Sequence, residues 1–367
     1  MKKLLAFRND WAGRGELGQD LIGGPSYYRI TKPVQFLRRK YNVFEFGDLV
    51  ACQANLARVG KNWEIDEIIP NLIRDSDIVL MKNVSHPGGL GMFAGAAEYY
   101  NKPLILDMDD DYLSVDPEHP WGEYFASNTV QQLTHNELFK ASTAMIVSTE
   151  PLVDVYKPYN QNIHVIHNYN DVEDWQFERR KHKSKIVIGW AGSSMHKHDL
   201  GEFRPVMDIL WEKYGDKILF AFCGAWTDDH LKGFPRKAYR TFSGTKDMRD
   251  YPAALAGWGF DIGVAPIVKS AFNDGKGHGK WMEYSMYKTP TVASNFGPYK
   301  RTMEDGVTGL LAETTDEWVD KISRLVDDAA LRQQIGQTAY DHVKANWQWA
   351  DHYQEWEKVF SQYQTFR

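Results

Sequence analysis

The sequence predicts an α/β protein with two Rossmann-like, doubly wound domains that face each other across a cleft. Apolar runs without alternation, such as DIVLMKN at 77–83, are separated along the chain by helical segments. Such runs are typical of parallel strands that helices cover on both faces. The pattern pauses in a charged segment at 171–184, typical of a linker, and then starts again. A chain of 367 residues exceeds what one core usually accommodates, which also favours two domains.

The first domain is expected over residues 1–170. It opens with the strand-like run KLLAFRN, which leads into a glycine-rich segment at 13–30. Apolar runs bounded by polar or glycine-rich turns predict strands, and longer periodic segments predict helices. The predicted strands are 3–9, 41–46, 77–83, 103–111, 144–150 and 163–168, and the predicted helices include 33–40 and 91–100.

The second domain is expected over residues 185–330. A last helical stretch, 331–367, has no strand after it, so we expect it to pack back on the N-terminal domain. In open α/β sheets ligands bind beyond the carboxyl ends of the strands, which predicts a cleft between the domains. The predicted strands are 185–194, 217–226, 261–267, 291–294 and 309–313, and the helical segments include 201–214, 248–258 and 315–326.

The composition is that of a soluble globular protein, 43% hydrophobic and 25% charged. No run approaches the ~20 apolar residues of a membrane span, and MKKLLAFRND turns polar too early for a signal peptide, so a cytoplasmic location is expected.

Cys52 and Cys223 are expected to be buried free thiols, with neither disulfide nor zinc. The net charge of −6 argues against a protein that is basic overall. Basic clusters at 38–40, 179–185 and 235–240 favour solvated faces or linkers, with nucleic acid or an anionic membrane as the alternative.

The segment KGHGKWMEYSMYKTPTVAS at 276–294 carries the clearest chemical signal. Glycines lead into a short helix, and the N–H groups and dipole of a helix N-terminus favour an anion such as phosphate. Lys280 and Glu283 are three residues apart and share a helix face, with Lys276 and Gly277 in the loop before them. The alternative is a surface ion pair on a capped helix.

Four segments together resemble glycosyltransferases of the GT-B fold, in the retaining group that includes glycogen synthases and bacterial lipopolysaccharide and mannosyl transferases. The segment 276–313 resembles the group's most specific motif, in which a glutamate opens EAMA-G-PVVAS before an acidic loop and a G-x-x-G-LL strand. The resemblance implies that the second domain binds a nucleotide-sugar donor and the first domain binds the acceptor. The other three segments are 23–46, 146–171 and 188–199.

The resemblance also implies roles for individual residues. Glu283 would accept hydrogen bonds from the ribose hydroxyls of the donor. The loop of Gly192, Ser193 and Ser194 would hold the diphosphate, although the serines could instead only cap the following helix.

One position departs from the family pattern. Gly275 occupies the place where a second glutamate is usual, and Asp274 beside it is the candidate for that glutamate's role. Lys276 and Lys280 shift the local chemistry toward ammonium groups, which can neutralise a leaving diphosphate without a metal ion.

Acidic and histidine residues give further candidates. LDMDDDY at 106–112 favours strand-end acids that cap a helix or pair with basic residues, with acceptor binding or metal as alternatives. The WAGSSMHKHD loop at 190–199 favours phosphate or sugar contact over a solvated loop or a metal site.

A retaining enzyme needs no protein base, because the leaving phosphate can take the acceptor's proton. An inverting enzyme needs one, and the candidates are Asp109, Asp110, His196 and His198.

The N-terminal segment GGPSYYRI at 23–30 completes the candidate site. Gly23 and Gly24 could let the backbone approach the donor, and Arg29 could reach the same anion or form an internal salt bridge. A dinucleotide site is disfavoured because GRGELG lacks the G-x-G-x-x-G spacing.

The sequence and the resemblance thus predict a retaining, metal-independent glycosyltransferase that needs no cofactor beyond its nucleoside-diphosphate sugar donor. The expected acceptor is a carbohydrate, a lipid-linked molecule or another hydroxyl compound. The alternatives are transfer to a hydroxylated base in nucleic acid, a nucleotide-sugar epimerase or hydrolase of the same fold, and a binding module without catalysis.

Overall fold

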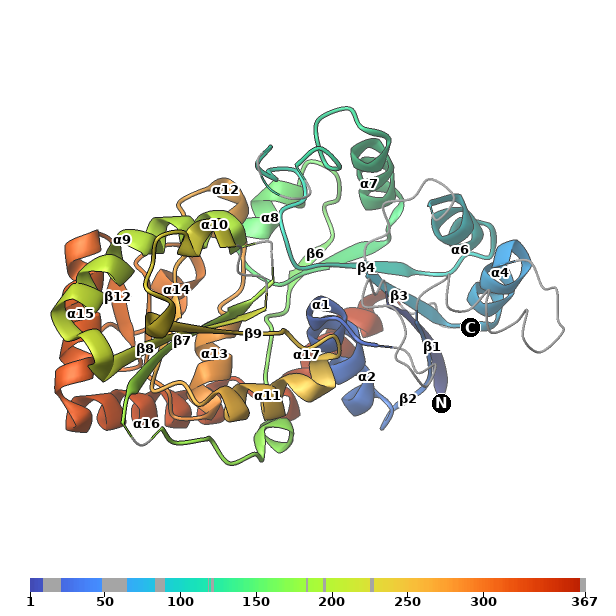
Figure 1. Cartoon of the computed structure of the whole chain (residues 1–367). Coiled ribbons are helices and arrows are strands. Elements are labelled where there is room, and N and C mark those ends of the chain that lie inside the picture. Colours follow the sequence, from blue (N-terminus) through green and yellow to red (C-terminus); the bar gives the residue numbers. More distant parts are fainter. Residues whose placement is uncertain are drawn as a thin grey trace, which may run out of the picture.

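The computed structural model describes residues 1–8, 21–47, 65–82, 90–117, 119, 122–182, 184–193, 196–224 and 228–363. Two α/β domains lie side by side, the N-terminal one coloured blue to green and the C-terminal one yellow-green to orange (Figure 1). Each contains one six-stranded parallel sheet flanked by helices, which confirms the predicted fold class.

The N-terminal sheet has the strand order β2-β1-β3-β4-β5-β6. The register places Leu4 of β1 between Val43 of β2 and Ile78 of β3. Separate apolar clusters cover the two faces of this sheet, which explains why its strands show apolar runs without alternation. The strands are β1 (Lys2–Phe7), β2 (Tyr41–Phe46), β3 (Ile78–Lys82), β4 (Leu104–Met108), β5 (Ala144–Val147) and β6 (Ile163–Val165).

Helical structure begins earlier than predicted in the N-terminal domain. The helix expected over 33–40 is the end of a continuous segment that starts at Gly24, with Pro25 in its first turn, where proline is well tolerated. Glycine disfavours a helix, but Tyr27 and Tyr28 are buried on this one. The helices are α1 (Gly24–Ser26), the π-helical η1 (Tyr27–Thr31), α2 (Lys32–Leu37), α4 (Ile65–Asp75), η2 (Gly91–Gly95), α6 (Ala96–Tyr99), α7 (Val130–Ala141) and α8 (Pro151–Tyr156).

The C-terminal sheet has the strand order β12-β11-β10-β7-β8-β9. The order reverses between β7 and β10, and ligands bind at such a switch point in doubly wound folds. The edge strand β9 was not predicted, because its sequence YRTF is half-exposed and lacks an apolar run. The strands are β7 (Ile186–Gly192), β8 (Ile218–Gly224), β9 (Tyr239–Phe242), β10 (Ile262–Ala265), β11 (Thr291–Ser294) and β12 (Leu310–Ala312).

The helices of this half surround the second sheet and then return to the first domain. Short 3-10 turns lie at η3 (Val172–Trp175), η5 (Gly215–Lys217), η6 (Arg236–Ala238) and η7 (Met248–Asp250). The helices are α9 (Lys197–Tyr214), α10 (Asp228–Leu231), α11 (Tyr251–Trp258), α12 (Ala271–Asp274), α13 (Gly279–Met286), α14 (Gly297–Thr302), α15 (Thr315–Asp327), α16 (Ala329–Asn346) and α17 (Trp349–Tyr363).

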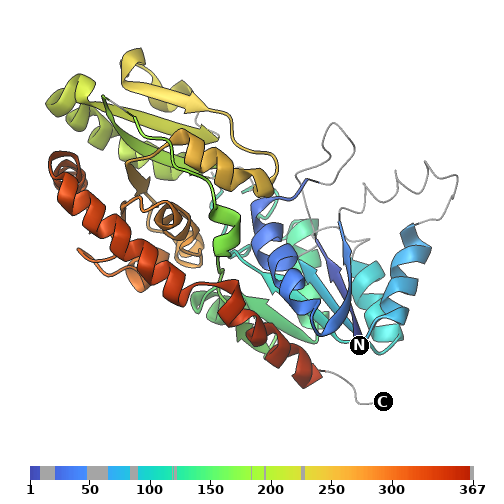
Figure 2. The same ribbon diagram turned by 90° about the horizontal axis from the view of Figure 1, so that it is seen from below.

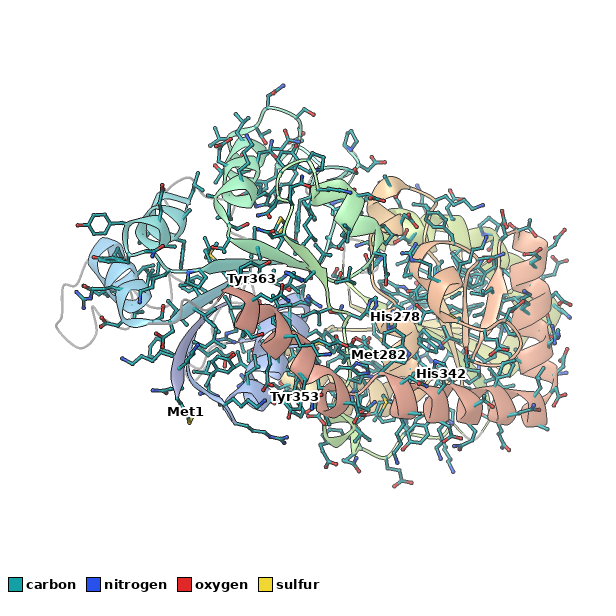
Figure 3. All side chains as sticks on the ribbon, turned by 180° about the vertical axis from the view of Figure 1, so that it is seen from behind. Met1, His278, Met282, His342, Tyr353 and Tyr363 are labelled. Carbon is teal, nitrogen blue, oxygen red and sulfur yellow. The ribbon has the colours of Figure 1, made fainter. Side chains whose placement is uncertain are left out.

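The last two helices span both domains. Figure 2 shows α16 running along the C-terminal domain and α17 continuing beneath the N-terminal one. Trp349, Trp356 and Phe360 of α17 are fully buried in one cluster with residues of the N-terminal strands. Figure 3 labels Tyr353 and Tyr363 on this helix, and also His342 of α16 near Met282 of α13. The chain end therefore ties the two domains together behind the cleft.

None of the helices in the described part of the chain is long and apolar enough to cross a membrane. Cys223 is a buried free thiol, as expected. Cys52 lies outside the described residues.

Candidate active site

A cavity of about 570 Å³ opens between the two domains, where strands of both sheets end. The N-terminal wall is formed by Gly24, Pro25, Tyr28, Asp109, Asp110 and Asn168. The opposite wall includes Gly192, Ser193, His196, Lys276, Gly277, Gly279, Lys280 and Glu283. The structure thus brings together most of the residues that the sequence singled out.

The N-terminus of α13 faces this cavity. The first backbone bond inside the helix runs from the N–H of Met282 to the carbonyl of His278, so the N–H groups before Met282 have no partner within the helix. Gly277, Gly279 and Lys280 line the cavity at this helix end. The loop, the positive end of the helix dipole and the Lys280 ammonium therefore face one cavity, and such an arrangement favours an anion.

Lys280 is a half-buried cation at this point. Its Nζ lies 3.0 Å from Nε2 of His196 and 5.6 Å from the centroid of the Trp190 ring. Burial, together with the charge of Lys276, lowers the pKa of Lys280 to about 8. Lys280 is therefore mostly protonated at neutral pH.

Glu283 is held by two tyrosines, one from each domain. Its Oε1 accepts a hydrogen bond from the Tyr28 hydroxyl at 2.9 Å, and its Oε2 accepts one from the Tyr251 hydroxyl at 3.0 Å. Burial raises the pKa of the Glu283 carboxyl, while Lys280 and both tyrosine hydroxyls oppose that rise. The Tyr28 bond joins the two domains across the cavity.

His196 lies between Lys280 and a buried carboxylate. Its Nδ1 is 2.7 Å from Oδ2 of Asp199, which is 3% exposed. Burial and the neighbouring Lys280 lower the pKa of His196 to about 3, so the imidazole is neutral. His198, another candidate base, is exposed and lines a separate cavity of about 140 Å³.

The acids after β4 form part of the opposite wall. Asp109 pairs with Lys82, while Oδ1 of Asp110 lies 3.5 Å from Nζ of Lys276 in the other domain. Burial would raise the pKa of Asp109, but the Lys82 ammonium lowers it overall. Burial raises the pKa of Asp110, and the charge of Asp109 acts in the same direction. Both carboxylates line the cavity and also pair with lysines. The pairing agrees with the interpretation as strand-end acids that pair with basic residues, and the position at the cavity is compatible with acceptor binding.

The loop after β7 requires glycine where the backbone passes the cavity. A Cβ on Gly192 would lie 2.6 Å from the Trp190 ring. Gly224 on the adjacent strand has φ +102°, and a Cβ there would lie 1.8 Å from the Gly192 carbonyl oxygen. Ser193 lines the cavity, whereas Ser194 lies outside the described residues.

Arg29 forms the internal salt bridge rather than a wall of the cavity. It is 0% exposed, and its Nε and Nη2 donate to the Asp107 carboxylate at 2.6–3.2 Å. Its Nη1 donates to the carbonyl of Ile166 at 2.6 Å. This corrects the expectation that Arg29 contacts a donor. Gly24 lines the cavity, and Gly23 precedes it as the N-cap of α1.

Asp274 does not line the cavity either. Its carboxylate accepts a hydrogen bond from Nη1 of Arg301 at 2.6 Å, in a pair that is partly exposed. The structure therefore contradicts the suggestion that Asp274 replaces the glutamate missing at Gly275. A Cβ at Gly275 would lie 2.8 Å from the Leu152 side chain, so the local packing favours glycine there.

No group of three or more His, Cys, Asp or Glu side chains in the described ranges is placed to hold a metal ion. The basic clusters are partly neutralised by neighbouring carboxylates. One cation from each cluster pairs with an acid: Lys40 with Glu357, Arg179 with Asp261 and Lys237 with Asp216.

Sequence reasoning missed several residues of the site. Tyr28 and Tyr251 are not singled out by the sequence, and only the fold brings them to Glu283. Asp199 ends the 190–199 segment three residues after His196, but the segment alone does not show that their side chains pair. Further lining residues of the cavity were also missed, because they come from several separate elements and share no motif. These residues are Cys223, Gly224, Gly244, Thr245, Met248 and Trp258.

Comparisons with known proteins agree with this architecture. Residues 171–342 match the family described as glycosyl transferases group 1. HepE from Anabaena, solved in complex with UDP and glucose, has a TM-score of 0.69 at 13% identity, over 99% of this chain and 100% of that one. The sucrose-phosphate synthase of Thermosynechococcus elongatus has a TM-score of 0.63 at 12% identity, with 99% of both chains covered. At such identities the likeness shows the fold alone.

A sequence relative is the D-inositol 3-phosphate glycosyltransferase of Corynebacterium diphtheriae. It is 37% identical over 81 residues, which cover 22% of this chain and 19% of the relative. The chain therefore spans about a fifth of the length of that relative.

Proposed function

We propose that this chain, which has the GT-B fold and matches the group 1 glycosyl transferases over residues 171–342, transfers a sugar from a nucleoside-diphosphate sugar to an acceptor hydroxyl. One observation carries the proposal. Lys276, Lys280 and the N-terminus of α13 face the same interdomain cavity as the Glu283 carboxylate. That set matches the anionic and hydroxyl-bearing parts of such a donor.

Glu283 is proposed to bind the ribose. A carboxylate has about four lone-pair sites, and the Tyr28 and Tyr251 hydroxyls occupy one on each oxygen. Each oxygen thus keeps acceptor capacity for one of two adjacent ribose hydroxyls. The tyrosines fix the carboxylate before the ligand arrives, which reduces the entropy lost on binding.

The ammonium groups are proposed to stabilise the leaving diphosphate. Cleavage of the bond from the anomeric carbon to the phosphate leaves negative charge on the phosphate, and preorganised cations and N–H groups stabilise that charge. Lys276 and Lys280 supply the cations from within the cavity. We therefore propose transfer that needs no metal ion.

The acceptor is proposed to bind against the N-terminal wall, where Asp109 and Asp110 can accept hydrogen bonds from its hydroxyls. Carbohydrate and lipid-linked acceptors both carry hydroxyls of this kind. Asp110→Asn is expected to raise the acceptor KM about tenfold, because one charge-assisted bond is weakened, with slow hydrolysis of the donor retained. Equal losses of transfer and hydrolysis would argue against an acceptor role.

Retention of configuration is part of the proposal. In a retaining reaction the leaving phosphate takes the acceptor's proton, so no protein base is needed. Both ring nitrogens of His196 already have hydrogen-bond partners, which agrees with a reaction in which His196 is not the base. Proton NMR of the first product would show an α-glycoside from an α-linked donor, and a β-glycoside would establish inversion.

The test begins with nucleotide-sugars in the presence and absence of chelator. UDP-sugars come first, because HepE was solved with UDP and glucose. A ligand of the native state raises the Tm by mass action, and the winning donor is then incubated with simple sugars and with inositol phosphate as acceptors. Transfer that survives chelation supports the proposal, whereas no Tm shift and no transfer with UDP-, GDP-, ADP- or CDP-sugars would refute it.

Three alternatives have distinct outcomes. An epimerase or hydrolase would change the donor without any acceptor present, and a binding module would leave it intact. A nucleic-acid acceptor would show binding that weakens steeply with salt. The pairing of the basic clusters with carboxylates gives that acceptor little support.

A further inference from the structure

A chain of three side chains leads from the core of the second domain to the cavity. Oδ2 of Asp199 lies 2.7 Å from Nδ1 of His196, and Nε2 of His196 lies 3.0 Å from Nζ of Lys280. Asp199 is buried at 3% exposure, whereas His196 and Lys280 line the cavity. An Asp–His pair of this kind usually indicates a general base, but here Lys280 occupies the nitrogen that would take the proton.

The inner end of the chain is fixed by two further donors. Oδ1 of Asp199 accepts hydrogen bonds from the backbone N–H of Val268 at 2.8 Å and from Nδ2 of Asn273 at 3.0 Å. These bonds leave Oδ2 facing His196. The orientation of the carboxylate is therefore set by groups outside the cavity.

The direction of every hydrogen bond in the chain follows from its two ends. A carboxylate can only accept, so Nδ1 of His196 carries the proton and donates it to Asp199. An ammonium group can only donate, so Nε2 of His196 offers its lone pair to Lys280. A single neutral tautomer of His196 satisfies both neighbours.

We propose that Asp199 and His196 are positioning residues that hold the Lys280 ammonium toward the donor diphosphate by fixing the Nδ1-protonated tautomer of His196. The inference rests on the proposed function, because it assigns a use to Lys280. It replaces the expectation that His196 acts as a base. His196 instead gives Lys280 a partner that does not cancel its charge, which a carboxylate in the same place would do.

Several other charged groups face Lys280 and act on its protonation. Burial and the charge of Lys276 lower the pKa of Lys280 to about 8, whereas the neighbouring carboxylates act to raise it. The lone pair of His196 also stabilises the protonated form. Besides Asp199 and His196 on α9, the groups that face Lys280 are Glu283 on α13, Lys276 in the loop before it and Asp110 after β4.

The sharpest test is Asp199→Asn, measured as the pH dependence of kcat/KM for the donor. Val268 and Asn273 hold the amide oxygen in the Oδ1 position, so the amide NH₂ faces Nδ1 of His196. The imidazole proton then moves to Nε2 and points at the ammonium. We expect the alkaline limb of the profile, near pH 8 in the wild type, to fall by about one pH unit.

The control is Asp208→Asn, the same substitution at an exposed position of the same helix, where Asp208 pairs with Arg204. It is expected to leave the alkaline limb in place. A folded Asp199→Asn protein whose limb does not move, or a control whose limb moves equally, would overturn the inference.

A second measurement needs no folded variant at Asp199. In wild-type protein with ¹⁵N-labelled histidine, the signals that vanish in His196→Gln belong to His196. The ring nitrogens of the Nδ1-protonated tautomer give a shift pattern distinct from the Nε2-protonated one. An Nε2-protonated or fully protonated ring at pH 7 would overturn the inference even if Asp199→Asn does not fold.

The two proposals fail in different ways. If the wild type neither binds nor transfers any nucleotide-sugar, the proposed function fails, while the NMR measurement still decides the tautomer. If the wild type is active and either the tautomer or the pH profile disagrees, only the positioning role fails.

Discussion

Arg29 is a fully buried cation of the N-terminal domain and Lys280 a half-buried cation of the C-terminal domain, and the sequence gives both as candidates for contact with the same anion. Arg29 has no exposed surface, and a carboxylate and a backbone carbonyl accept its hydrogen bonds. Lys280 has a neutral imidazole as its hydrogen-bond partner. Within the described part of the chain no carboxylate lies within salt-bridge distance of Lys280.

The difference shows how a protein separates a structural cation from a functional one. A charge that is neutralised by a buried carboxylate has no attraction left for a ligand, and breaking the pair leaves its partner uncompensated. A charge held by a neutral acceptor keeps most of its field. Arg29 is therefore expected to stabilise the fold, and Lys280 to stabilise a bound anion.

The largest expected effect is on stability at Arg29. Arg29→Met leaves Asp107 buried with its main partner removed, which costs about 3–5 kcal/mol of unfolding free energy. Urea unfolding followed by circular dichroism measures it, with the exposed Arg324→Met as control. If Arg29→Met keeps the wild-type urea midpoint but loses donor binding, Arg29 has a binding role and not a structural one.

Lys280→Met is expected to do the reverse. The kcat falls about 10²–10³-fold, because a preorganised donor to the leaving group is lost. The urea midpoint is maintained or rises, because a partly desolvated charge is removed. Steady-state kinetics and the same unfolding assay measure the two effects. Lys300→Met, on the exposed side of α14, serves as control, and a wild-type kcat in Lys280→Met would contradict the role of this lysine.

Glu283→Gln tests the carboxylate beside Lys280. Donor affinity is expected to fall about 10–100-fold, because hydrogen bonds to a charged acceptor contribute about 1.5–3 kcal/mol each. Isothermal titration with the nucleoside diphosphate measures the change, and Glu313→Gln, whose exposed carboxylate pairs with Lys269, is the matched control. Unchanged affinity would remove the assignment of the ribose to Glu283.

The smallest expected effect is at Tyr28. Tyr28→Phe removes only the interdomain bond to Glu283, so the donor KM rises about three- to tenfold, as loss of one hydrogen bond implies. Tyr251→Phe removes a hydrogen bond to the same carboxylate from within the C-terminal domain. Its effect on the donor KM is therefore the loss expected for a hydrogen bond that does not join the two domains. The exposed Tyr99→Phe is the control. Equal effects at Tyr28 and Tyr251 would show that the interdomain position of Tyr28 is unimportant.

Much of the fold could be predicted from local sequence. The strand at 291–294 and the helix from 315 have the bounds or the start that periodicity indicated, because apolar runs, caps and breakers act over a few residues. The edge strand β9 and the early start of the helix at Gly24 could not, because packing against distant elements decides them. The segments at 9–20 and 48–64 lie outside the described residues and do not bear on this comparison.

The sequence by itself determined the two-domain α/β architecture and the chemical character of the site, since residue types and short spacings carry that information. It named Lys280 and Glu283, and the structure places both at the cavity. Only the tertiary structure decided that Arg29 and Asp274 are paired away from the cavity and that Asp199 supports His196. The physical reason is that the effect of a charge depends on its neighbours in the fold: Asp107 lies 78 residues from Arg29, and Val268 and Asn273, which orient Asp199, lie 69 and 74 residues from it.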